Sequence, residues 1–411
     1  MAVIRPFCAL RPTPDNASAV AAVPYDVVST DEARKMATGN PLSFLRVSRA
    51  EIDLPDDTDP YDQKVYEQAT RNLATLVSSA PLVVESEPSL YIYRLRTNDH
   101  EQIGIAGCFS LDEYDRNVVK RHERTRPDKE DDRTRHMLAL GAQTGIVFLA
   151  YRANDVLESF TVSNVLTAPL LDIVAPDGVQ HTVWRISTTD TENIVAAFAA
   201  VQSIYIADGH HRIASAARAR DELCDPDPAA ESRYFLGVAF PDTSTRILPY
   251  NRTVTDLAGQ TTEGFLTALG SRFSVTANAS PEPLKGQVSM YLADAWYGVD
   301  FSPVRSAIGG DGESVVKQLD VAILQDYVLA PFLNVKDIRT DPRVTFVGGS
   351  RGTAALEQAV DSGAAAVAFS LAAVTPSELL AISDAGDIMP PKSTWFEPKL
   401  RDGLLTHRFS S

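Results

Sequence analysis

A strand that runs through a glycine turn directly into a helix is the sequence feature that most constrains this fold. Residues 203–207 form a short apolar run, Asp208 and Gly209 form the turn, and the sequence from His210 onward is typical of a helix. Such a junction presents unpaired backbone N–H groups beside the positive end of the helix dipole. Glycine also lets an anion approach the backbone closely. The junction therefore predicts a phosphate-binding turn at the end of a buried strand.

The side chains around this turn strengthen the prediction. His210, His211 and Arg212 supply further donors, and Arg212 can grip two oxygens of an anion, while Asp208 can hold a divalent cation or orient a histidine. Neighbouring residues of a helix point about 100° apart, so the two histidines should not ligate the same ion. The alternative is an aspartate cap followed by two solvent-facing histidines. Because two of the seven histidines precede Arg212 at the end of a buried strand, we favour a functional site.

A second candidate lies in the mixed-charge sequence of residues 120–133, which follows an expected strand and precedes an expected helix. Glu123 then projects from a loop, where a carboxylate can accept a proton from a substrate hydroxyl. The alternative is a solvated run of mixed charge, which composition alone favours. The sequence therefore indicates a possible general base at Glu123.

The C-terminal residues 389–404 form a third candidate. Two prolines stiffen the approach to Lys392, Ser393 and Thr394, and two aromatic residues can pin this stretch to a core. Lys392 and Lys399 are then possible partners for an oxyanion. A rigid tail with exposed lysines explains the same residues equally well.

The N-terminal sequence offers a fourth, weaker candidate. Asp26, Asn40 or Arg46 could contribute a polar side chain to a pocket. However, Pro24 fixes a bend and Asn40 opens a turn, and turn chemistry accounts for both segments. We therefore favour a structural role here.

The chain is expected to form two α+β regions. Its 411 residues, 44% of them hydrophobic, are enough for more than one core. Residues 224–231 are acidic, contain two prolines and lack apolar periodicity, so we place a boundary there. The first predicted region, residues 1–224, contains the HE motif (residues 122–123) and the DGHHR motif (residues 208–212). The second, residues 225–411, ends with the PPKSTWF segment (residues 390–396), which we expect to return to the site.

Charge and cysteine content exclude several classes of protein. Acidic residues outnumber basic ones 54 to 38, which disfavours binding to nucleic acid or to an anionic membrane. The three cysteines have neither a disulfide pattern nor a zinc pattern. This cysteine usage fits the reducing cytoplasm, and we find no export signal and no apolar run long enough to span a membrane. The expected partners are a small-molecule substrate and a nucleotide. The oligomeric state is left open.

The order of the motifs resembles the family catalogued as domain of unknown function 1015. The shared motifs are PF near the start, VPYDVV, NP.S.LR, HE.T, IADGHHR and the final MPPKSTWF.PKL..GL, which together span nearly the whole chain. More remotely, HE, DGHHR and the late PKST segment resemble the free serine kinases with a ParB/sulfiredoxin-like fold. This resemblance implies an α+β protein with a ParB/sulfiredoxin-like core and additional α+β elements. It also implies Mg²⁺ as cofactor and ATP or ADP as phosphoryl donor.

The resemblance implies roles for particular residues. Glu123 would be the base on the serine hydroxyl, and the turn from Asp208 to Arg212 would bind nucleotide phosphate. Lys392 is the candidate partner of a substrate carboxylate, with Arg46 in reserve. The resulting assignments are catalytic for Glu123, Asp208, His210 and His211; cofactor-binding for Gly209, His211 and Arg212; substrate-binding for Lys392, Ser393, Thr394 and Arg46; and metal-binding for Asp208.

These residues lead to one expected function and one rival. The expected function is phosphoryl transfer between ATP or ADP and free L-serine, or the reverse transfer from phosphoserine, since both directions need the same groups. The rival is a ParB-like nucleotide-binding switch or clamp without metabolite turnover. Sulfiredoxin-like chemistry is disfavoured because His210, rather than a cysteine, follows Gly209. The longer chain and the longer segment between Glu123 and Asp208 indicate an inserted element.

Overall fold

The computed structural model describes residues 2–79, 81–308 and 314–409, which fold into two compact units. Unit 1 comprises the described parts of residues 1–245 and 398–411, and unit 2 comprises residues 246–397. Both units combine helices with sheets, as the α+β prediction requires. Within the described part of the chain, no helix is both long and apolar enough to cross a membrane.

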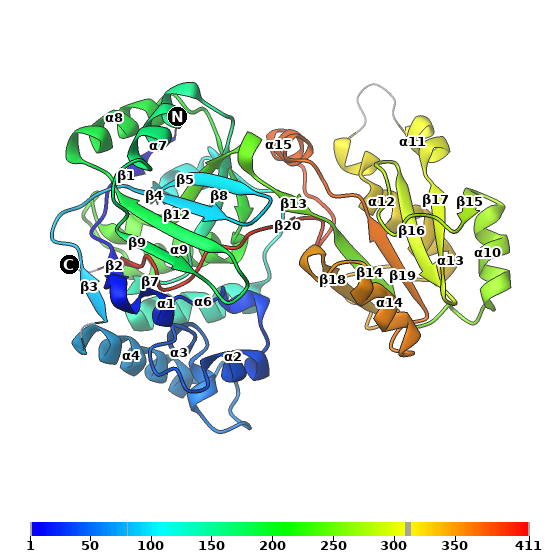
Figure 1. Cartoon of the computed structure of the whole chain (residues 1–411), viewed down its shortest axis with the longest axis horizontal. Coiled ribbons are helices and arrows are strands. Elements are labelled where there is room, and N and C mark those ends of the chain that lie inside the picture. The colour runs from blue at the N-terminus through cyan, green and yellow to red at the C-terminus, as the bar shows by residue number, and fades with distance from the viewer. Residues whose placement is uncertain (1, 80, 309–313, 410–411) are drawn as a thin grey trace. The chain divides into compact units, whose positions relative to one another are not determined.

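Unit 1 contains one large sheet and several helices (Figure 1). Its helices are α1 (Ala17–Val20), α2 (Thr30–Ala37), α3 (Leu45–Ser48), α4 (Gln63–Ser78), α5 (Leu111–Asp115), α6 (Pro127–Leu140), α7 (Asp155–Asn164), α8 (Thr188–Phe198) and α9 (His210–Leu223). Its strands are β1 (Ile4–Arg5), β2 (Leu10–Pro12), β3 (Leu82–Val84), β4 (Tyr91–Arg96), β5 (Glu101–Ser110), β6 (Val119–Lys120), β7 (Ala142–Gln143), β8 (Val147–Tyr151), β9 (Leu171–Val174), β10 (Gln180–Arg185), β11 (Ile204–Asp208), β12 (Tyr234–Pro241) and β21 (His407–Arg408).

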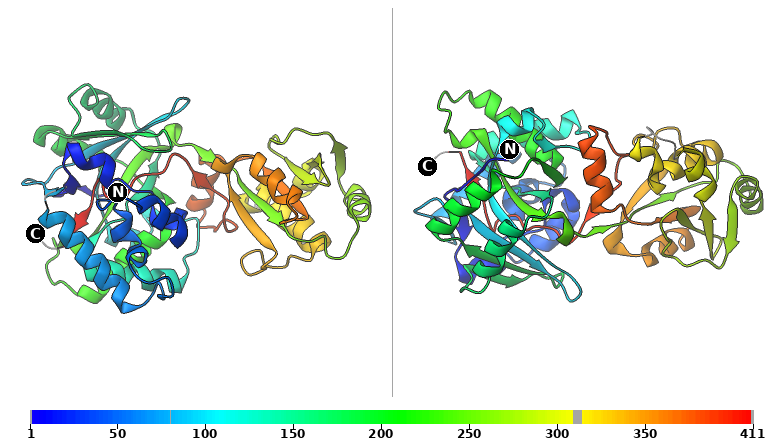
Figure 2. Two further views of the ribbon diagram at one scale, coloured as in Figure 1. Left: turned by 60° about the horizontal axis from the view of Figure 1, so that its bottom comes forward. Right: turned by 90° about the horizontal axis from the view of Figure 1, so that it is seen from above.

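The main sheet of unit 1 has the strand order β6-β11-β8-β12-β5-β4-β10-β9, and β1 also pairs with β5. Two pairs are parallel, β6 with β11 and β8 with β12, and the other pairs are antiparallel. In Figure 1, α7 and α8 lie on one side of this sheet and α2, α3 and α4 lie on the other. Figure 2 shows from another direction that α7 and α8 lie together. Apolar side chains of the sheet, α6, α8 and α9 form a large core.

The boundary between the units differs from the one we expected after residue 224. Residues 224–231 connect α9 to β12 inside unit 1, and the chain leaves this unit only after Thr245. The reason is that β12 pairs with both β5 and β8 in the middle of the main sheet. Composition marks 224–231 as a loop, but it carries no information about the distant strands that β12 joins.

Unit 2 is an α+β unit with its own antiparallel sheet of order β15-β17-β16-β19-β14-β18. Its strands are β13 (Ile247–Leu248), β14 (Tyr250–Val254), β15 (Ser274–Ala277), β16 (Gln287–Leu292), β17 (Ala295–Asp300), β18 (Val344–Gly348), β19 (Val367–Leu371) and β20 (Trp395–Phe396). Its helices are α10 (Thr262–Gly270), α11 (Ser302–Ile308), α12 (Asp320–Leu324), α13 (Ala330–Leu333), α14 (Ala354–Asp361) and α15 (Pro376–Asp384).

The C-terminal tail returns to unit 1 and is buried there. Asp402 exchanges backbone hydrogen bonds with Ala22, and β21 pairs with β7. The Asp402 side chain is 2% exposed, and its Oδ2 atom has no hydrogen-bond partner among the described residues. Burial, with a smaller contribution from Asp26, raises the pKa of this carboxyl to about 7, although Arg212 opposes the shift. The tail therefore places an uncharged or weakly charged carboxyl in the interior.

This pKa predicts a pH dependence of stability. A carboxyl whose pKa is higher in the folded chain than its usual 3.8 stabilises the fold when it is protonated, so this contribution is lost as the pH rises from about 4 to 7. We expect Asp402→Asn to remove the dependence, since the amide stays neutral. Urea unfolding of both proteins at several pH values should therefore show the wild type losing stability relative to the variant over this range. A difference that does not change with pH would show that Asp402 titrates normally.

Candidate functional site

The candidate site forms where β6 and β11 end side by side. In this parallel pair, Ile204 lies opposite Val119, so the loop after β6 and the turn after β11 lie at the same edge of the sheet. The loop carries His122 and Glu123, and α9 begins at His210 directly after the turn. The structure thus brings together two of the candidates that the sequence suggests separately.

Gly209 is required by the turn between β11 and α9. Its φ angle of 102° lies in the left-handed region that glycine adopts without strain. A Cβ atom here would lie 3.3 Å from Cδ of Arg212 and 3.4 Å from Cα of Val147. The turn therefore depends on a glycine for its backbone conformation, and a larger residue would also press on its neighbours.

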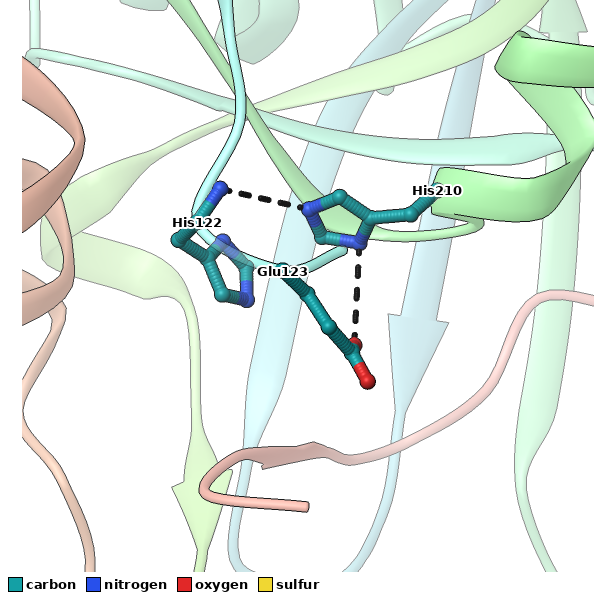
Figure 3. Close-up of side chains that lie close together, drawn as sticks. All are labelled: His122, Glu123 and His210. Carbon is teal, nitrogen blue, oxygen red and sulfur yellow. Dashed lines mark hydrogen bonds and ion pairs between the residues drawn. The ribbon is translucent and has the colours of Figure 1, made fainter. Parts of the chain in front are cut away.

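His210 links the turn to the loop after β6 (Figure 3). Its Nε2 atom accepts a hydrogen bond of 3.4 Å from the backbone N–H of His122, and its Nδ1 atom lies 3.9 Å from Oε2 of Glu123. The two imidazole rings meet edge to face, with 4.4 Å between their centroids. Both histidines are buried, whereas 37% of the Glu123 side chain is exposed. Glu123 is thus the member of this cluster that a substrate can reach.

Burial also sets the charge of the two imidazoles. Removal from water lowers the pKa of His122 to about 4, and it lowers the pKa of His210 well below its usual value, although Asp208 opposes both shifts. Both rings are therefore neutral near pH 7. Since Nε2 of His210 accepts a hydrogen bond, its ring proton lies on Nδ1, which faces Glu123.

His211 has a different partner from His210. Its Nε2 atom accepts a hydrogen bond of 3.0 Å from the backbone N–H of Arg126, the residue before α6. The two neighbouring histidines therefore serve different contacts, in agreement with the helical geometry that argues against a shared ion. His211 joins the start of α6 to the start of α9.

Arg212 lies in the interior of unit 1. The residue is 3% exposed, its Nη2 atom donates to both carboxylate oxygens of Asp26 at 2.9 Å, and its Nη1 atom donates to the carbonyl of Ile146 at 2.7 Å. Although burial favours the neutral form, Asp26 and Asp208 raise the pKa of Arg212 above its usual value. The guanidinium is therefore charged, and protein groups already occupy much of its donor capacity.

Asp208 is held between two cations. Its Oδ2 atom lies 3.4 Å from Nζ of Lys399 and 3.8 Å from Nη2 of Arg212. Burial favours protonation, but Lys399 and Arg212 hold the pKa of Asp208 below its usual value. This carboxylate is consequently ionised at neutral pH.

Three residues of this site were not assigned from the sequence. His122 had a usable signal, because it directly precedes Glu123 in the same loop. The sequence suggests only a possible oxyanion partner for Lys399, and it favours a structural role for Asp26. The sequence near Lys399 does not indicate that this residue pairs with Asp208, and the sequence near Asp26 does not indicate that it pairs with Arg212. In both pairs the partners lie far apart in the chain.

Arg46 makes its contacts elsewhere in unit 1. Its guanidinium pairs with Asp53 and donates to the carbonyl groups of Asn40, at 3.1 Å, and Ala37, at 3.0 Å. These partners belong to the N-terminal helices and the turns between them. The contacts described for Arg46 are therefore those of a structural residue.

The late segment with Lys392, Ser393 and Thr394 lies in unit 2. Lys392 is exposed, with its Nζ atom 5.5 Å from the ring centre of Tyr250. The Ser393 hydroxyl donates to the carbonyl of Pro390 at 2.6 Å, and Thr394 is half-buried. The role of this segment in binding a substrate stays a prediction.

Comparison with solved structures finds several similar proteins. The chain is similar to a free serine kinase in complex with AMP, with 13% identity, a TM-score of 0.36 and coverage of 76% of this chain and 94% of that one. It is similar to SbnI with C-terminal truncation from Staphylococcus aureus, with 11% identity, a TM-score of 0.38 and coverage of 72% and 85%. It is also similar to a conserved hypothetical protein from Pyrococcus furiosus, with 14% identity, a TM-score of 0.35 and coverage of 73% and 94%. No curated protein matches the sequence.

The family model described as Protein of unknown function (DUF1015) matches residues 4–322. The match covers unit 1 from residue 4 through β12, including the loop with Glu123 and the turn with Gly209, and continues into unit 2. The chain therefore belongs to the DUF1015 family.

Proposed function

We propose that this protein transfers a phosphoryl group between a nucleotide and the hydroxyl group of a small metabolite, most simply free L-serine. The observation that carries the proposal is the approach of Glu123 to His210, 3.9 Å between Oε2 and Nδ1, beside the glycine turn at the start of α9. One edge of the sheet thus offers a proton acceptor and an anion-binding turn. On this proposal unit 1 has a ParB/sulfiredoxin-like core, and the motif resemblance supplies the choice of serine.

Glu123 is the proposed base. Its carboxylate is exposed enough for a substrate hydroxyl to reach it, and proton removal makes that oxygen a better nucleophile. His210 acts as a positioning residue, because its neutral ring directs Nδ1–H toward the carboxylate. The backbone N–H of His122 holds the other side of that ring in place. In the reverse direction, protonated Glu123 returns the proton to the departing hydroxyl.

The turn at Gly209 is the proposed phosphate site. The first backbone N–H groups of α9 and the positive end of its dipole favour an anion there. Arg212 helps to hold this turn in place without contacting the phosphate, because its buried guanidinium hydrogen-bonds to Asp26 and forms an ion pair with Asp208. We therefore assign Arg212 a positioning role in place of the direct phosphate contact expected from the sequence.

Asp208 fits a magnesium ion that is shared with phosphate. Magnesium sites beside nucleotides often use one or two carboxylates together with phosphate oxygens and water. Asp208 is ionised, and the contacts of both Lys399 and Arg212 are made to Oδ2, so Oδ1 is the atom proposed to hold the ion. Magnesium, when bound, would neutralise charge on the phosphoryl group. Either ATP or ADP satisfies this chemistry.

The role of Glu123 predicts a separation of binding from turnover. Glu123→Gln keeps the size of the side chain but removes its basicity, so we expect turnover to fall about 10²- to 10⁴-fold with both ligands still bound. Single-turnover rates with saturating nucleotide and serine, beside calorimetric dissociation constants, measure the two effects. Glu87→Gln is the matched control, because 75% of that side chain is exposed and its ion pair is with Arg185.

Each outcome of this experiment has a distinct meaning. A wild-type rate in Glu123→Gln would remove Glu123 from the chemistry. Nucleotide binding with altered assembly and no serine-dependent transfer in the wild type would instead support a ParB-like switch or clamp. A screen of other amino acids and polyols by phosphorus NMR would reveal transfer to a different acceptor.

The phosphate turn gives a second prediction. Gly209→Ala places a side chain on a left-handed backbone and against Arg212, so we expect nucleotide to bind at least about tenfold more weakly. Gly39→Ala is the matched control, because its φ angle is 74° and a Cβ there meets no atom within 4 Å. Calorimetric titration with ADP should show the loss only at Gly209. Equal affinities in folded forms of both variants would move the donor phosphate away from the turn.

A further inference from the structure

The side chains of His122, Glu123 and His210, the His-Glu-His cluster, offer a second kind of chemistry. One potential ligand atom from each residue lies within 4.8 Å of the other two (Figure 3). In the described ranges 2–79, 81–308 and 314–409, no other trio of histidine, cysteine or acidic side chains meets this criterion. His122 and Glu123 are consecutive residues of the loop after β6, and His210 is the first residue of α9. The pairing of β6 with β11 in the main sheet brings the three residues together.

His122 provides an independent sign of a ligand. The residue is 2% exposed, and within the described part of the chain its Nδ1 atom has no hydrogen-bond partner. A neutral imidazole carries one proton on its two ring nitrogens, so the other nitrogen keeps a lone pair that can bind a metal. A buried imidazole with an unpartnered ring nitrogen, beside a second histidine and a carboxylate, is therefore a candidate metal ligand.

We propose that the His-Glu-His cluster binds one divalent transition-metal ion of the Zn²⁺ class. Two imidazoles and one carboxylate are ligands that such ions prefer, whereas Mg²⁺ prefers oxygen alone. Three protein ligands leave a fourth position for water or another ligand. The site is distinct from the magnesium site proposed at Asp208, which uses a carboxylate and phosphate oxygens.

The geometry needs only local adjustment to hold the ion. Tetrahedral zinc with bonds of about 2.0–2.1 Å brings its ligand atoms to about 3.3–3.4 Å from each other. The 3.9 Å between Glu123 and His210 must therefore shorten, and the partly exposed Glu123 side chain can rotate to do so. The ligand atom of His122 lies within 4.8 Å of both, and the loop after β6 must close any remaining difference. A metal on Nδ1 of His210 moves the ring proton to Nε2. The contact that is then lost, at 3.4 Å, is longer than an ordinary hydrogen bond.

The bound ion would compete with the proposed reaction. The positive charge of a metal bound to a carboxylate lowers the affinity of that carboxylate for a proton, so Zn²⁺ in the cluster makes Glu123 a much weaker base. This consequence rests on the proposed function, but the binding of the metal does not. Binding can therefore be measured without nucleotide or serine, and its failure would leave the proposed phosphoryl transfer untouched.

The test is a titration of chelator-treated full-length protein with Zn²⁺ by calorimetry and with Co²⁺ by visible absorption. We expect one ion per chain, a cobalt spectrum typical of nitrogen and oxygen ligands, and no displacement by millimolar Mg²⁺. Glu123→Gln and His210→Ala should each weaken binding at least about tenfold. His211→Ala is the matched control and should bind normally, because that ring contacts the Arg126 backbone.

Glu123→Gln keeps the test decisive if a buried histidine variant does not fold, since the Glu123 side chain is partly exposed. Thermal unfolding identifies any variant that has lost its structure. Absence of Zn²⁺ binding by the wild type would overturn the proposal. Unchanged affinity in folded Glu123→Gln, or a loss confined to His211→Ala, would overturn it equally.

Discussion

Strands β6 and β11 run parallel over only two residue pairs, and the candidate site depends on the direction of that pairing. Most of the main sheet is antiparallel, so the ends of neighbouring strands usually lie at opposite edges. An antiparallel β6 would carry Glu123 to the edge opposite the turn at Gly209. The parallel pair brings the loop and the turn together, and His210 then fills the space between them.

A cluster of charged side chains lies beside the turn at Gly209 and links it to distant parts of the chain. Arg212 lies between Asp26 and Asp208, and the C-terminal tail adds Lys399 beside Asp208. Arg212 is the buried member of this cluster, and loss of its carboxylate partners would leave its charge uncompensated in the interior. Asp402 lies near the same guanidinium, but burial outweighs the opposing effect of Arg212 and raises the pKa of Asp402 to about 7. The tail is therefore part of the electrostatics of the site.

The sequence predicted features that depend on neighbouring residues and missed those that depend on distant ones. The strand, turn and helix around Gly209 were predicted correctly because apolar composition, glycine and helix formers follow one another directly. The domain boundary could not be found in this way, because the pairing of β12 with β5 and β8 decides it. The burial of Arg212 could not be predicted from the sequence for a similar reason. Its partner Asp26 approaches from the N-terminal part of the chain.

The contrast in exposure within the His-Glu-His cluster explains how one arrangement can serve two kinds of chemistry. His122 and His210 are buried and contact each other edge to face, so both have less freedom to move than Glu123. Glu123 is partly exposed and can turn either toward the imidazoles or toward an arriving molecule. A bound metal ion would turn Glu123 toward the imidazoles, and a substrate hydroxyl would turn it toward the substrate. Because both need the same carboxylate, the occupant of this site determines whether Glu123 is a ligand or a base.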